Sequence, residues 1–458
     1  MIHLDDFFQH ENQSCPPALS CDGKLRYCNK SDLLGCLEKL VPSQQEPPSV
    51  STLVIDGAAL VNMLAPQQCK TFDDYAVKIF LPHISAKLKQ GKRLHLVWDQ
   101  YLQHSLKSMT RDKRGLGVRR RVVPSALLPR SWSDFLRVPD NKTELFTFLS
   151  GYVAGMPIDT CKEVIVTDGC NAMYNPNAEH ASMLEPCSHE EADTRVMLHI
   201  AHAVSKGHTS LMIRTVDTDV VVIAVSCFHR LPSVQLWVAF GVGKSYRYLA
   251  THELAAALGT DRCKAIAFFH AFSGCDTVSS FAGNGKKRAF DTWQAFPEVT
   301  DAFAMLSSEP DSVAASMPLL ERFVVLLYDR SSSKTAVNAA RKQLFTKKGR
   351  SMEYLPPTEA ALSQHVKRAA YQSGYVWYRS LQPQQELPSP ELWGWIREDE
   401  PSEWQPLWTT MPDVTQSCSE LVSCKCKKGC TKRCKCVKAA LECTALCHCD
   451  GNCTREKT

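Results

Sequence analysis

The sequence predicts an α/β fold with a mostly parallel sheet, followed by a helical extension and a small C-terminal zinc cluster. Between residues 51 and 300, short apolar runs of strand length alternate with longer stretches of helical character. Three of the first four runs end at an aspartate. Ten of the 21 cysteines lie in the last 41 residues, and this crowding indicates metal binding.

Four apolar runs are expected to form strands of the sheet. They cover residues 52–55, 93–98, 163–166 and 211–216. Asp56, Asp99 and Asp217 directly follow three of these runs, and Asp168 lies close behind the fourth. Because parallel sheets bind ligands at the carboxyl ends of their strands, the sequence places these acidic residues where a ligand site is expected.

Helical stretches are expected between and after the strands. Residues 75–89, 190–204 and 252–258 have helical character, and residues 310–382 are expected to be mostly helical. Residues 1–50 are polar and show no clear period. Residues 383–415 hold several prolines and four tryptophans, too aromatic for a free linker, so we expect them to lie over the core.

Composition narrows the class of protein. With 458 residues, of which 44% are hydrophobic, the chain is long enough for two or three domains. No segment reaches the roughly 18 consecutive apolar residues of a membrane helix, and the acidic N-terminus lacks the apolar part of a secretory signal. We therefore expect a protein of the nucleus or the cytoplasm with no disulfide framework, and a nucleic-acid partner would favour a nuclear location.

Positive charge is concentrated in two stretches. The formal net charge is only +5, but residues 424–458 hold nine Lys or Arg against three acidic residues. A second basic run covers residues 107–121. That run also fits a solvated, charged helix, and the net charge alone does not predict nucleic-acid binding.

Seven carboxylates stand beside apolar segments. They are Asp56, Asp99, Glu191, Asp193, Asp217, Asp219 and Asp276. Taken singly, each fits a turn, a loop or the start of a helix, where Ser188 and Glu191 match a capping box. Taken together, they are costly to bury near one another unless cations compensate them. Because Mg²⁺ prefers carboxylate oxygen, the set predicts a divalent metal centre.

The order and spacing of these acids resemble the flap endonuclease family, a branch of the PIN-like nucleases. The matching positions are Asp56, Asp99, the pair Glu191–Asp193, Asp217-x-Asp219 and Gly274-Cys275-Asp276. The resemblance covers roughly residues 50–300, and Asp193 stands where the family usually has glutamate. It implies a PIN-like three-layer core and two ions, Mg²⁺ or Mn²⁺, that activate water and stabilise a leaving oxygen. By this resemblance, one ion is held by Asp56, Asp99, Glu191 and Asp193, and the other by Asp217, Asp219 and Asp276.

Two further stretches match the same family. Residues 283–289 stand where the family carries a helix–two-turn–helix that grips duplex backbone, with a lysine in place of the usual proline. The implied DNA-binding residues are Gly283, Gly285, Lys286 and Lys287. Glycines let backbone N–H groups approach a phosphate, and lysines add charge. Lys107 and Arg114 match the family's residues that reach the scissile phosphate, so both are expected to be catalytic.

The C-terminal cysteines follow the pattern C-x-C-x3-C-x3-C-x-C-x6-C-x3-C-x-C-x3-C. They are Cys424, Cys426, Cys430, Cys434, Cys436, Cys443, Cys447, Cys449 and Cys453. Nine thiolates satisfy three tetrahedral Zn²⁺ ions if three of them bridge. The spacing resembles one repeat of the tesmin/TSO1-type CXC domain, with Arg433 where that family has a tyrosine that enters DNA. A redox or disulfide cluster is the alternative.

We interpret the chain as a metal-dependent nuclease that is structure-selective on DNA. The expected regions are an N-terminal extension (1–50), a nuclease core (51–300), a helical extension (301–382), a connector (383–415) and a zinc module (418–458). The alternative is a catalytically inactive protein that binds nucleic acid or assembles partners through the zinc module. The overall organisation also resembles animal proteins of mobile-element origin. DNA is favoured over RNA as the partner, and no membrane is expected.

Overall fold

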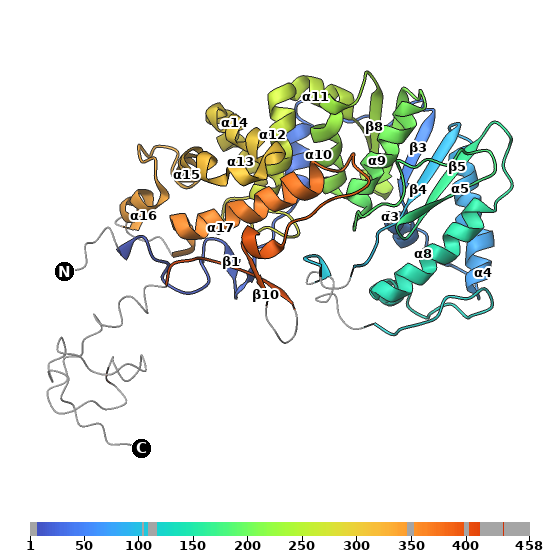
Figure 1. The fold of residues 1–458 in the computed structure, drawn as a ribbon, viewed down its shortest axis with the longest axis horizontal. Coiled ribbons are helices and arrows are strands. Elements are labelled where there is room, and N and C mark those ends of the chain that lie inside the picture. The colour runs from blue at the N-terminus through green and yellow to red at the C-terminus, as the bar shows by residue number, and fades with distance from the viewer. Residues whose placement is uncertain are drawn as a thin grey trace, which may run out of the picture.

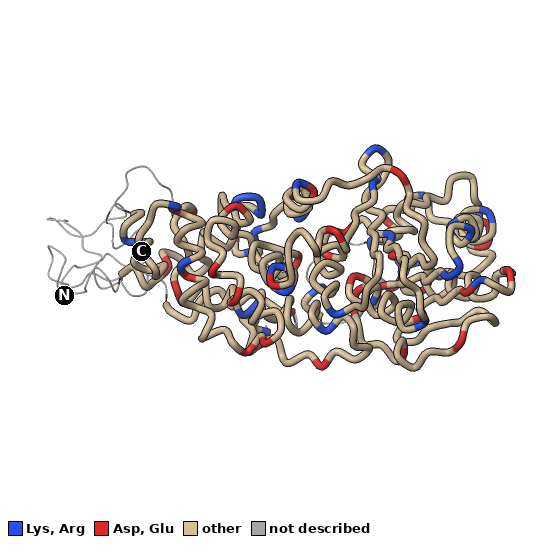
Figure 2. The backbone as a smooth tube through the Cα atoms, turned by 90° about the horizontal axis from the view of Figure 1, so that it is seen from above, with Lys and Arg blue, Asp and Glu red and all other residues tan. Residues whose placement is uncertain are grey.

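The computed structural model describes residues 7–102, 105–108, 117–345, 352–397 and 403–412, together with Cys434. Arg114 and eight of the nine cysteines of the predicted zinc module lie outside the described residues. Within them, no helix has both the length and the apolar character needed to cross a membrane. Lys and Arg alternate with Asp and Glu along the whole described body (Figure 2).

A seven-stranded sheet organises one half of the molecule. Its order is β6-β5-β4-β3-β7-β8-β9. The five central strands are parallel, and they are β3 (Thr52–Asp56), β4 (Arg93–Val97), β5 (Glu163–Asp168), β7 (Ser210–Thr215) and β8 (Gln235–Phe240). The edge strands β6 (Asn171–Tyr174) and β9 (Arg247–Ala250) are antiparallel to their neighbours. All four predicted strands are confirmed, and the sheet is mostly parallel as expected.

Helices cover both faces of the sheet and give it three layers (Figure 1). Val54 of β3 packs into the core shared with α9 (Ala192–Ser205), α10 (Thr218–Cys227) and α11 (Thr251–Leu258). Its neighbours Leu53 and Ile55 point into the opposite core. That second core is shared with α3 (Gly57–Met63), α5 (Leu81–Leu88) and α8 (Pro139–Ala154). Successive residues of a strand point to opposite faces, so the fully apolar strands fit a sheet that is covered on both sides. The predicted three-layer core is therefore confirmed.

The predicted helices also form, with shifted ends. The stretch predicted at 75–89 is a continuous run of α4 (Phe72–Tyr75), a π-helical turn (Ala76–Phe80) and α5. Helices α9 and α11 match the other two predictions within two residues at each end. The earlier start of the first helix follows from its cap, because the Thr71 side chain accepts a hydrogen bond from the Asp74 backbone N–H.

The second half of the molecule is helical. It comprises α12 (Thr260–Phe272), α13 (Lys286–Ala295), α14 (Thr300–Ser308), α15 (Val313–Tyr328), α16 (Val337–Phe345) and α17 (Glu359–Ala370), which continues as a π-helical stretch η7 (Tyr371–Trp377). The mostly helical prediction for residues 310–382 is confirmed. Phe269, Phe272 and Phe303 of this half belong to the same core as Val54 of the sheet. The two halves are thus joined by one continuous core.

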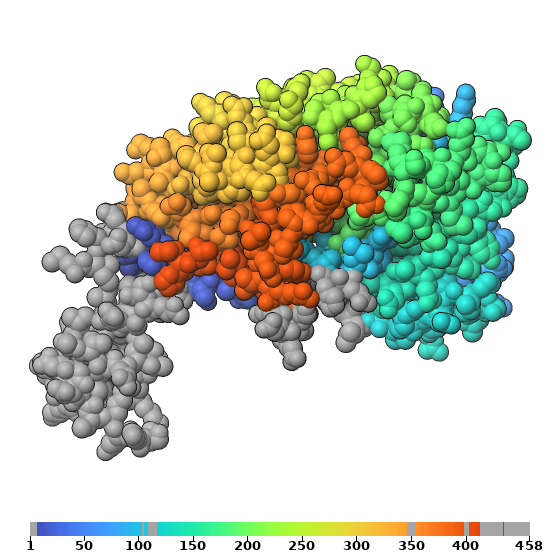
Figure 3. Space-filling view, viewed as in Figure 1, coloured from blue at the N-terminus to red at the C-terminus, as the bar shows by residue number. Residues whose placement is uncertain are grey.

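The connector lies over this core, as its tryptophans predict. Trp393, Trp395 and Trp408 are buried. The buried Arg368 guanidinium donates to the carbonyl oxygens of Gly394 at 2.9 Å and Leu407 at 2.7 Å, which fastens the connector to α17. In Figure 3 the connector, in darker orange to red, lies beside the orange surface of α17 and η7.

The N-terminal residues pack against the same helices. Helix α2 (Ser31–Leu37) buries Leu33, Leu34 and Leu37 in the core that contains α12 and α13. Backbone hydrogen bonds join this segment to the loop before α13, from Ala282 N to Ala18 O and from Ser280 N to Arg26 O, both 2.8 Å. The sequence shows no period in residues 1–50 because the buried residues are spread over short, irregular stretches.

Candidate metal centre

Asp56 and Asp99 stand at the carboxyl ends of neighbouring strands. Asp56 ends β3 and caps α3, accepting hydrogen bonds from Ala59 N at 3.0 Å and from the Thr215 hydroxyl at 3.1 Å. Gly57 is required at this turn, because a Cβ there would lie 2.2 Å from the Trp98 ring. Asp99 follows β4 and accepts a hydrogen bond from Ala192 N at 2.9 Å. The two strand ends therefore meet the start of α9.

Helix α9 brings the acid-x-acid pair to the same edge. Glu191 is the N-cap residue and Asp193 lies in the first turn. The Glu191 side chain makes no capping hydrogen bond, and the Ser188 hydroxyl instead accepts one from Gln385 N at 2.7 Å. The capping box that the sequence permits is therefore not formed. The Glu191 carboxylate is left to face Lys107, whose Nζ lies 2.6 Å from Oε1.

Asp217 and Asp219 open α10 at the end of β7. The Asp217 side chain caps the helix by accepting a hydrogen bond from Asp219 N at 2.9 Å. Asp219 is 1% exposed, and its Oδ1 lies 2.8 Å from Nε2 of the buried His270 on α12. Burial lowers the pKa of His270 to about 4, so the imidazole is neutral near pH 7 and donates to the carboxylate.

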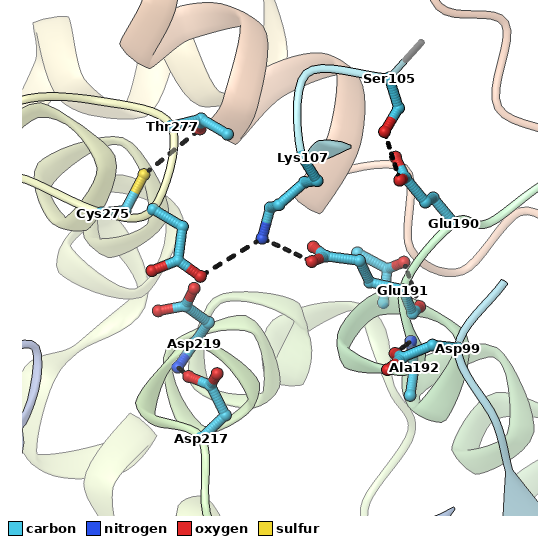
Figure 4. Close-up of polar contacts among 12 residues, drawn as sticks. Asp99, Ser105, Lys107, Glu190, Glu191, Ala192, Asp217, Asp219, Cys275 and Thr277 are labelled. Carbon is cyan, nitrogen blue, oxygen red and sulfur yellow. Dashed lines mark hydrogen bonds and ion pairs between the residues drawn. The ribbon is translucent and has the colours of Figure 1, made fainter. Parts of the chain in front are cut away.

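Asp276 and two lysines complete the site. Asp276 lies in the loop after α12, where Gly274 has a φ of +117° and its missing Cβ leaves room for Cys28 and Ser280. Lys30 Nζ lies 2.9 Å from Asp276 Oδ1, and Lys107 Nζ lies 3.6 Å from Oδ2. Figure 4 shows the Lys107 side chain reaching between Glu191 and the side of the site that carries Asp217 and Asp219. All seven predicted acids therefore gather in one region.

We divide the seven acids into two groups, following the two ions that the sequence predicts. The first acidic group is Asp56, Asp99, Glu191 and Asp193. The second acidic group is Asp217, Asp219 and Asp276. One set spans both groups, because ligand oxygens of Asp193, Asp217 and Asp219 lie within 4.8 Å of one another.

Three carboxyls of the first acidic group, those of Asp56, Glu191 and Asp193, have raised pKa values. Burial and the charge of Asp99 raise the pKa of Asp56 to about 7. Burial also raises the pKa of Glu191 to about 7, although Lys107 opposes the shift. Burial and the nearby charge of Asp217 raise the pKa of Asp193 well above its ordinary value. These carboxylates lack enough positive charge around them to ionise freely.

Asp219 in the second acidic group behaves in the opposite way. Burial alone would raise its pKa, but the Lys30 ammonium and the hydrogen bond from His270 hold the pKa below its ordinary value. Lys30 also contacts Asp217, at 3.4 Å from Oδ1. Burial raises the pKa of Asp217, and the charge of Asp219 raises it further. The chain thus supplies its own cation to this group.

The donor set fits a divalent ion. Oxygen ligands on carboxylates are those that Mg²⁺ and Mn²⁺ prefer, and Asp193, Asp217 and Asp219 present three of them within the span of one ion. Carboxylates with raised pKa values exchange protons for a metal as the metal binds. The remaining four acids lie around this set.

Lys30 and His270 are site residues that sequence reasoning did not identify. Lys30 lies in a polar stretch with no period, and His270 sits in an apolar helical run. Each contacts the site only through the tertiary fold, from residues far from Asp219 in the chain. No local motif signals either of them, so only the spatial arrangement could have found them.

One predicted DNA-binding residue is placed differently from the expectation. Lys286 is 0% exposed, and its Nζ donates to His270 O at 2.7 Å and to the Ser273 hydroxyl at 3.0 Å. The prediction that Lys286 contacts DNA is therefore wrong, because the side chain turns inward to satisfy buried oxygens at the end of α12. Lys287 is exposed at the start of α13.

The two predicted glycines flank the start of α13. Gly285 is its N-cap residue, and a Cβ there would meet no other atom within 4 Å. Gly283 has a φ of +68°, and a Cβ there would lie 2.8 Å from the Tyr354 ring. Gly285 and Lys287 line an open surface depression of about 580 Å³. Its other lining residues are Asp32, Arg288, Asp291 and Arg330.

A second cavity adjoins the acids on the side of Lys107 and Glu191. It has a volume of about 230 Å³ and is lined in part by Leu102, Tyr371 and Trp404. Gln372, Gln385 and Ser188 are among its polar lining residues. The connector forms one wall of this cavity, so residues from both ends of the fold shape the surroundings of the metal centre.

Comparison with known proteins yields structural similarity only. No family model matches the chain, and no curated protein matches its sequence. Among solved structures, the catalytic core of Rad2 in complex with a DNA substrate is 15% identical, with a TM-score of 0.34, over 71% of this chain and 95% of that one. A flap endonuclease of bacteriophage T5, in a complex with DNA and metal ions, is 12% identical, with a TM-score of 0.33, over 72% and 96%. The chemistry open to this chain is therefore defined by the residues of its own site.

Proposed function

We propose that this chain is a divalent-metal-dependent nuclease that hydrolyses phosphodiester bonds in DNA. The observation that carries the proposal is the convergence of Asp193, Asp217 and Asp219 oxygens within 4.8 Å, at the carboxyl ends of parallel strands. When bound there, divalent ions supply an activated water and stabilise the leaving oxygen. The two acidic groups support two ions, Mg²⁺ or Mn²⁺, as the sequence predicts.

Lys107 is suited to hold the scissile phosphate. The residue is 9% exposed. Its ammonium lies between Glu191 and Asp276 and so bridges the two acidic groups. An ammonium at this position neutralises a phosphate oxygen placed between the two groups. Arg114 is proposed for the same role from its sequence position alone.

A preference for junctions between double and single strands is supported by the two cavities. The depression at the start of α13 offers Lys287, Arg288 and Arg330 to a duplex backbone, although Asp32 and Asp291 also line it. The cavity beside Lys107 presents Tyr371 and Trp404, and aromatic rings accept unpaired bases of any sequence by stacking. Paired bases in a duplex are unable to enter such a cavity.

The C-terminal cysteine cluster is proposed to hold three Zn²⁺ ions and to add a cationic DNA-docking surface. Nine thiolates and nine basic residues in residues 424–458 support this assignment. A nuclear location and a mobile-element origin remain part of the proposal, on the grounds of the DNA substrate and the overall organisation.

A catalytically inactive DNA-binding protein is the competing function. The ion pairs of Lys30 with all three acids of the second acidic group favour it, because they already neutralise part of the site. The retention of all seven acids favours the nuclease.

Incubation of the purified chain with labelled flap, splayed, hairpin, blunt-duplex and single-stranded DNA tests the proposal. We expect cleavage in Mg²⁺ or Mn²⁺, none in EDTA, and faster cleavage of flap and splayed DNA. The matched control is the double variant Asp217→Asn, Asp219→Asn, purified in parallel to expose any contaminating nuclease. Binding without cleavage in either metal would establish the inactive alternative.

A further inference from the structure

Lys30 places a positive charge at the centre of the second acidic group. Its Nζ lies 2.9 Å from Asp219 Oδ2, 2.9 Å from Asp276 Oδ1 and 3.4 Å from Asp217 Oδ1. An ammonium has three N–H donors, and here each has a carboxylate oxygen to face. The side chain is 21% exposed, so the contact is largely shielded from water.

The segment that carries Lys30 is fixed to the loop that carries Asp276. Arg26 and Ala18 accept backbone hydrogen bonds from Ser280 and Ala282, and the Cys28 thiol donates to Gly274 O at 3.4 Å. The buried leucines of α2 hold the other side of Lys30 in the core. The ammonium is therefore held in place by the fold, and it is not the end of a loosely attached tail.

The oxygens that a second divalent ion would use are already engaged. Asp219 Oδ2 faces Lys30 and Oδ1 accepts the hydrogen bond from His270. Asp276 is shared between Lys30 and Lys107. An ion in the second acidic group has to take oxygens from Lys30 and also meets its repulsion at close range.

We propose that Lys30 is the resident cation of the second acidic group, and that a divalent ion binds to this group only by displacing it. The inference rests on the proposed metal centre and adds the order in which its two divalent ions bind. The first ion binds at the first acidic group, beside Asp193, where among the described residues Lys107 is the one lysine that makes an ion pair. The second ion binds much more weakly, and the displaced ammonium becomes available to a phosphate.

Mn²⁺ titration of the full-length chain tests this proposal without using nuclease activity. Free Mn²⁺ is measured by electron paramagnetic resonance for the wild type and for Lys30→Met, which keeps the length of the side chain and removes its charge. Lys24→Met is the matched control, because Lys24 is exposed in the same N-terminal segment and makes the same change of net charge. Lys30→Arg keeps the charge and serves if Lys30→Met fails to fold.

We expect one tight Mn²⁺ ion in the wild type and in Lys24→Met, with a second at least about tenfold weaker. A positive charge within about 4–6 Å of a carboxylate weakens proton binding by roughly this factor, and we expect a similar effect on a divalent ion. In Lys30→Met the second ion should tighten by about tenfold or more, and the two ions should show magnetic coupling. Lys30→Arg should retain the weak second ion.

Two results overturn the inference, and they are distinguishable. Two equally tight ions in the wild type, unchanged in Lys30→Met, would refute the role of Lys30 and leave the metal centre intact. Mn²⁺ binding that is unaffected by Asp217→Asn with Asp219→Asn would refute the metal centre itself, and with it the inference.

Discussion

The two acidic groups meet in one region of the molecule but are neutralised in different ways. The second group meets the ammonium of Lys30 on all three of its acids, and His270 adds a hydrogen bond to Asp219. The first group has only Lys107, through Glu191, among the described residues. Burial raises the pKa values of Asp56 and Glu191 to about 7 and also raises the pKa of Asp217, whereas the pKa of Asp219, which both Lys30 and His270 contact, is lowered.

This difference separates metal sites from ordinary ion pairs. Carboxylates that a protein pairs with its own lysines are stable without metal, and they resist metal binding. Carboxylates that are buried with few cations must take up protons or metal ions near neutral pH. The first acidic group, with Asp193 among its members, is therefore where the first divalent ion is expected to bind.

The largest expected effect is on catalysis. Asp217→Asn with Asp219→Asn should reduce cleavage by about 10³-fold or more, because two carboxylates that would hold a divalent ion are then lost. DNA affinity should stay within a few-fold of the wild type, since basic residues carry it. Single-turnover cleavage and a parallel binding titration measure both quantities. A double variant that cuts at the wild-type rate would contradict the metal assignment.

In the metal-free protein, removing the charge of one acid from each group should change the stability of the fold in opposite directions. Asp219→Asn should destabilise the fold by about 3 kcal/mol, because Lys30 loses a buried partner and His270 loses its acceptor. Asp193→Asn should stabilise it by on the order of 1 kcal/mol, because it removes a charge that burial and Asp217 disfavour. Chemical denaturation in EDTA measures both. If both variants changed the free energy of unfolding in the same direction, the proposed contrast between the two groups would be refuted.

The pH dependence of stability sharpens the same contrast. The folded-state pKa of Asp56 is about 7, above the value of about 4 expected in the unfolded chain. The folded protein therefore holds more protons between these values, and this carboxyl costs increasing stability as pH rises through that window. Asp56→Asn should equal the wild type near pH 4 and exceed it in stability by pH 8, measured in EDTA.

Saturating Mn²⁺ should reverse that ranking at pH 8, because the ion then stabilises the ionised wild-type carboxylate. If the stability difference between Asp56→Asn and the wild type were the same at every pH, the raised pKa of Asp56 would be refuted.

The smallest expected effect concerns the duplex-binding surface. Lys287→Ala should weaken duplex binding only a few-fold and reduce the slope of log affinity against log salt by about one. Lys244→Ala, at an exposed position near β9, is the matched control and should change neither. Fluorescence anisotropy over a salt series measures both slopes. A sequence-dependent loss in Lys287→Ala would instead indicate base contacts.

The fold was predictable because its signals are local. The central strands are short apolar runs; an aspartate ends β3, and another lies two residues beyond the end of each of β4 and β7. Parallel pairing then carries Asp56, Asp99 and Asp217 to one edge without further information. The same logic identified Glu191 and Asp193, which begin the helix that packs on that edge.

The cations of the site were not predictable in this way. Lys30 reaches Asp219 across 189 residues of chain, and nothing near it in the sequence marks it. Lys286 shows the opposite case. It stands in a glycine- and lysine-rich stretch typical of a phosphate-binding surface. Its ammonium nevertheless points inward, because it donates hydrogen bonds to two buried oxygens at the end of α12. The direction of a side chain at the start of a helix depends on tertiary contacts, and the spacing of residues in the sequence does not indicate these.

Anomalous diffraction from crystals of the full-length chain grown with Mn²⁺ tests the central claim most directly. We expect a strong peak beside Asp193 and the other acids of the first acidic group. A weaker or absent peak is expected among Asp217, Asp219 and Asp276 while Lys30 keeps its three ion pairs. In Lys30→Met crystals the second peak should gain occupancy. Ordered carboxylates with no peak beside Asp193 at millimolar Mn²⁺, or a strong peak among Asp217, Asp219 and Asp276 with the Lys30 ion pairs intact, would contradict this order of binding.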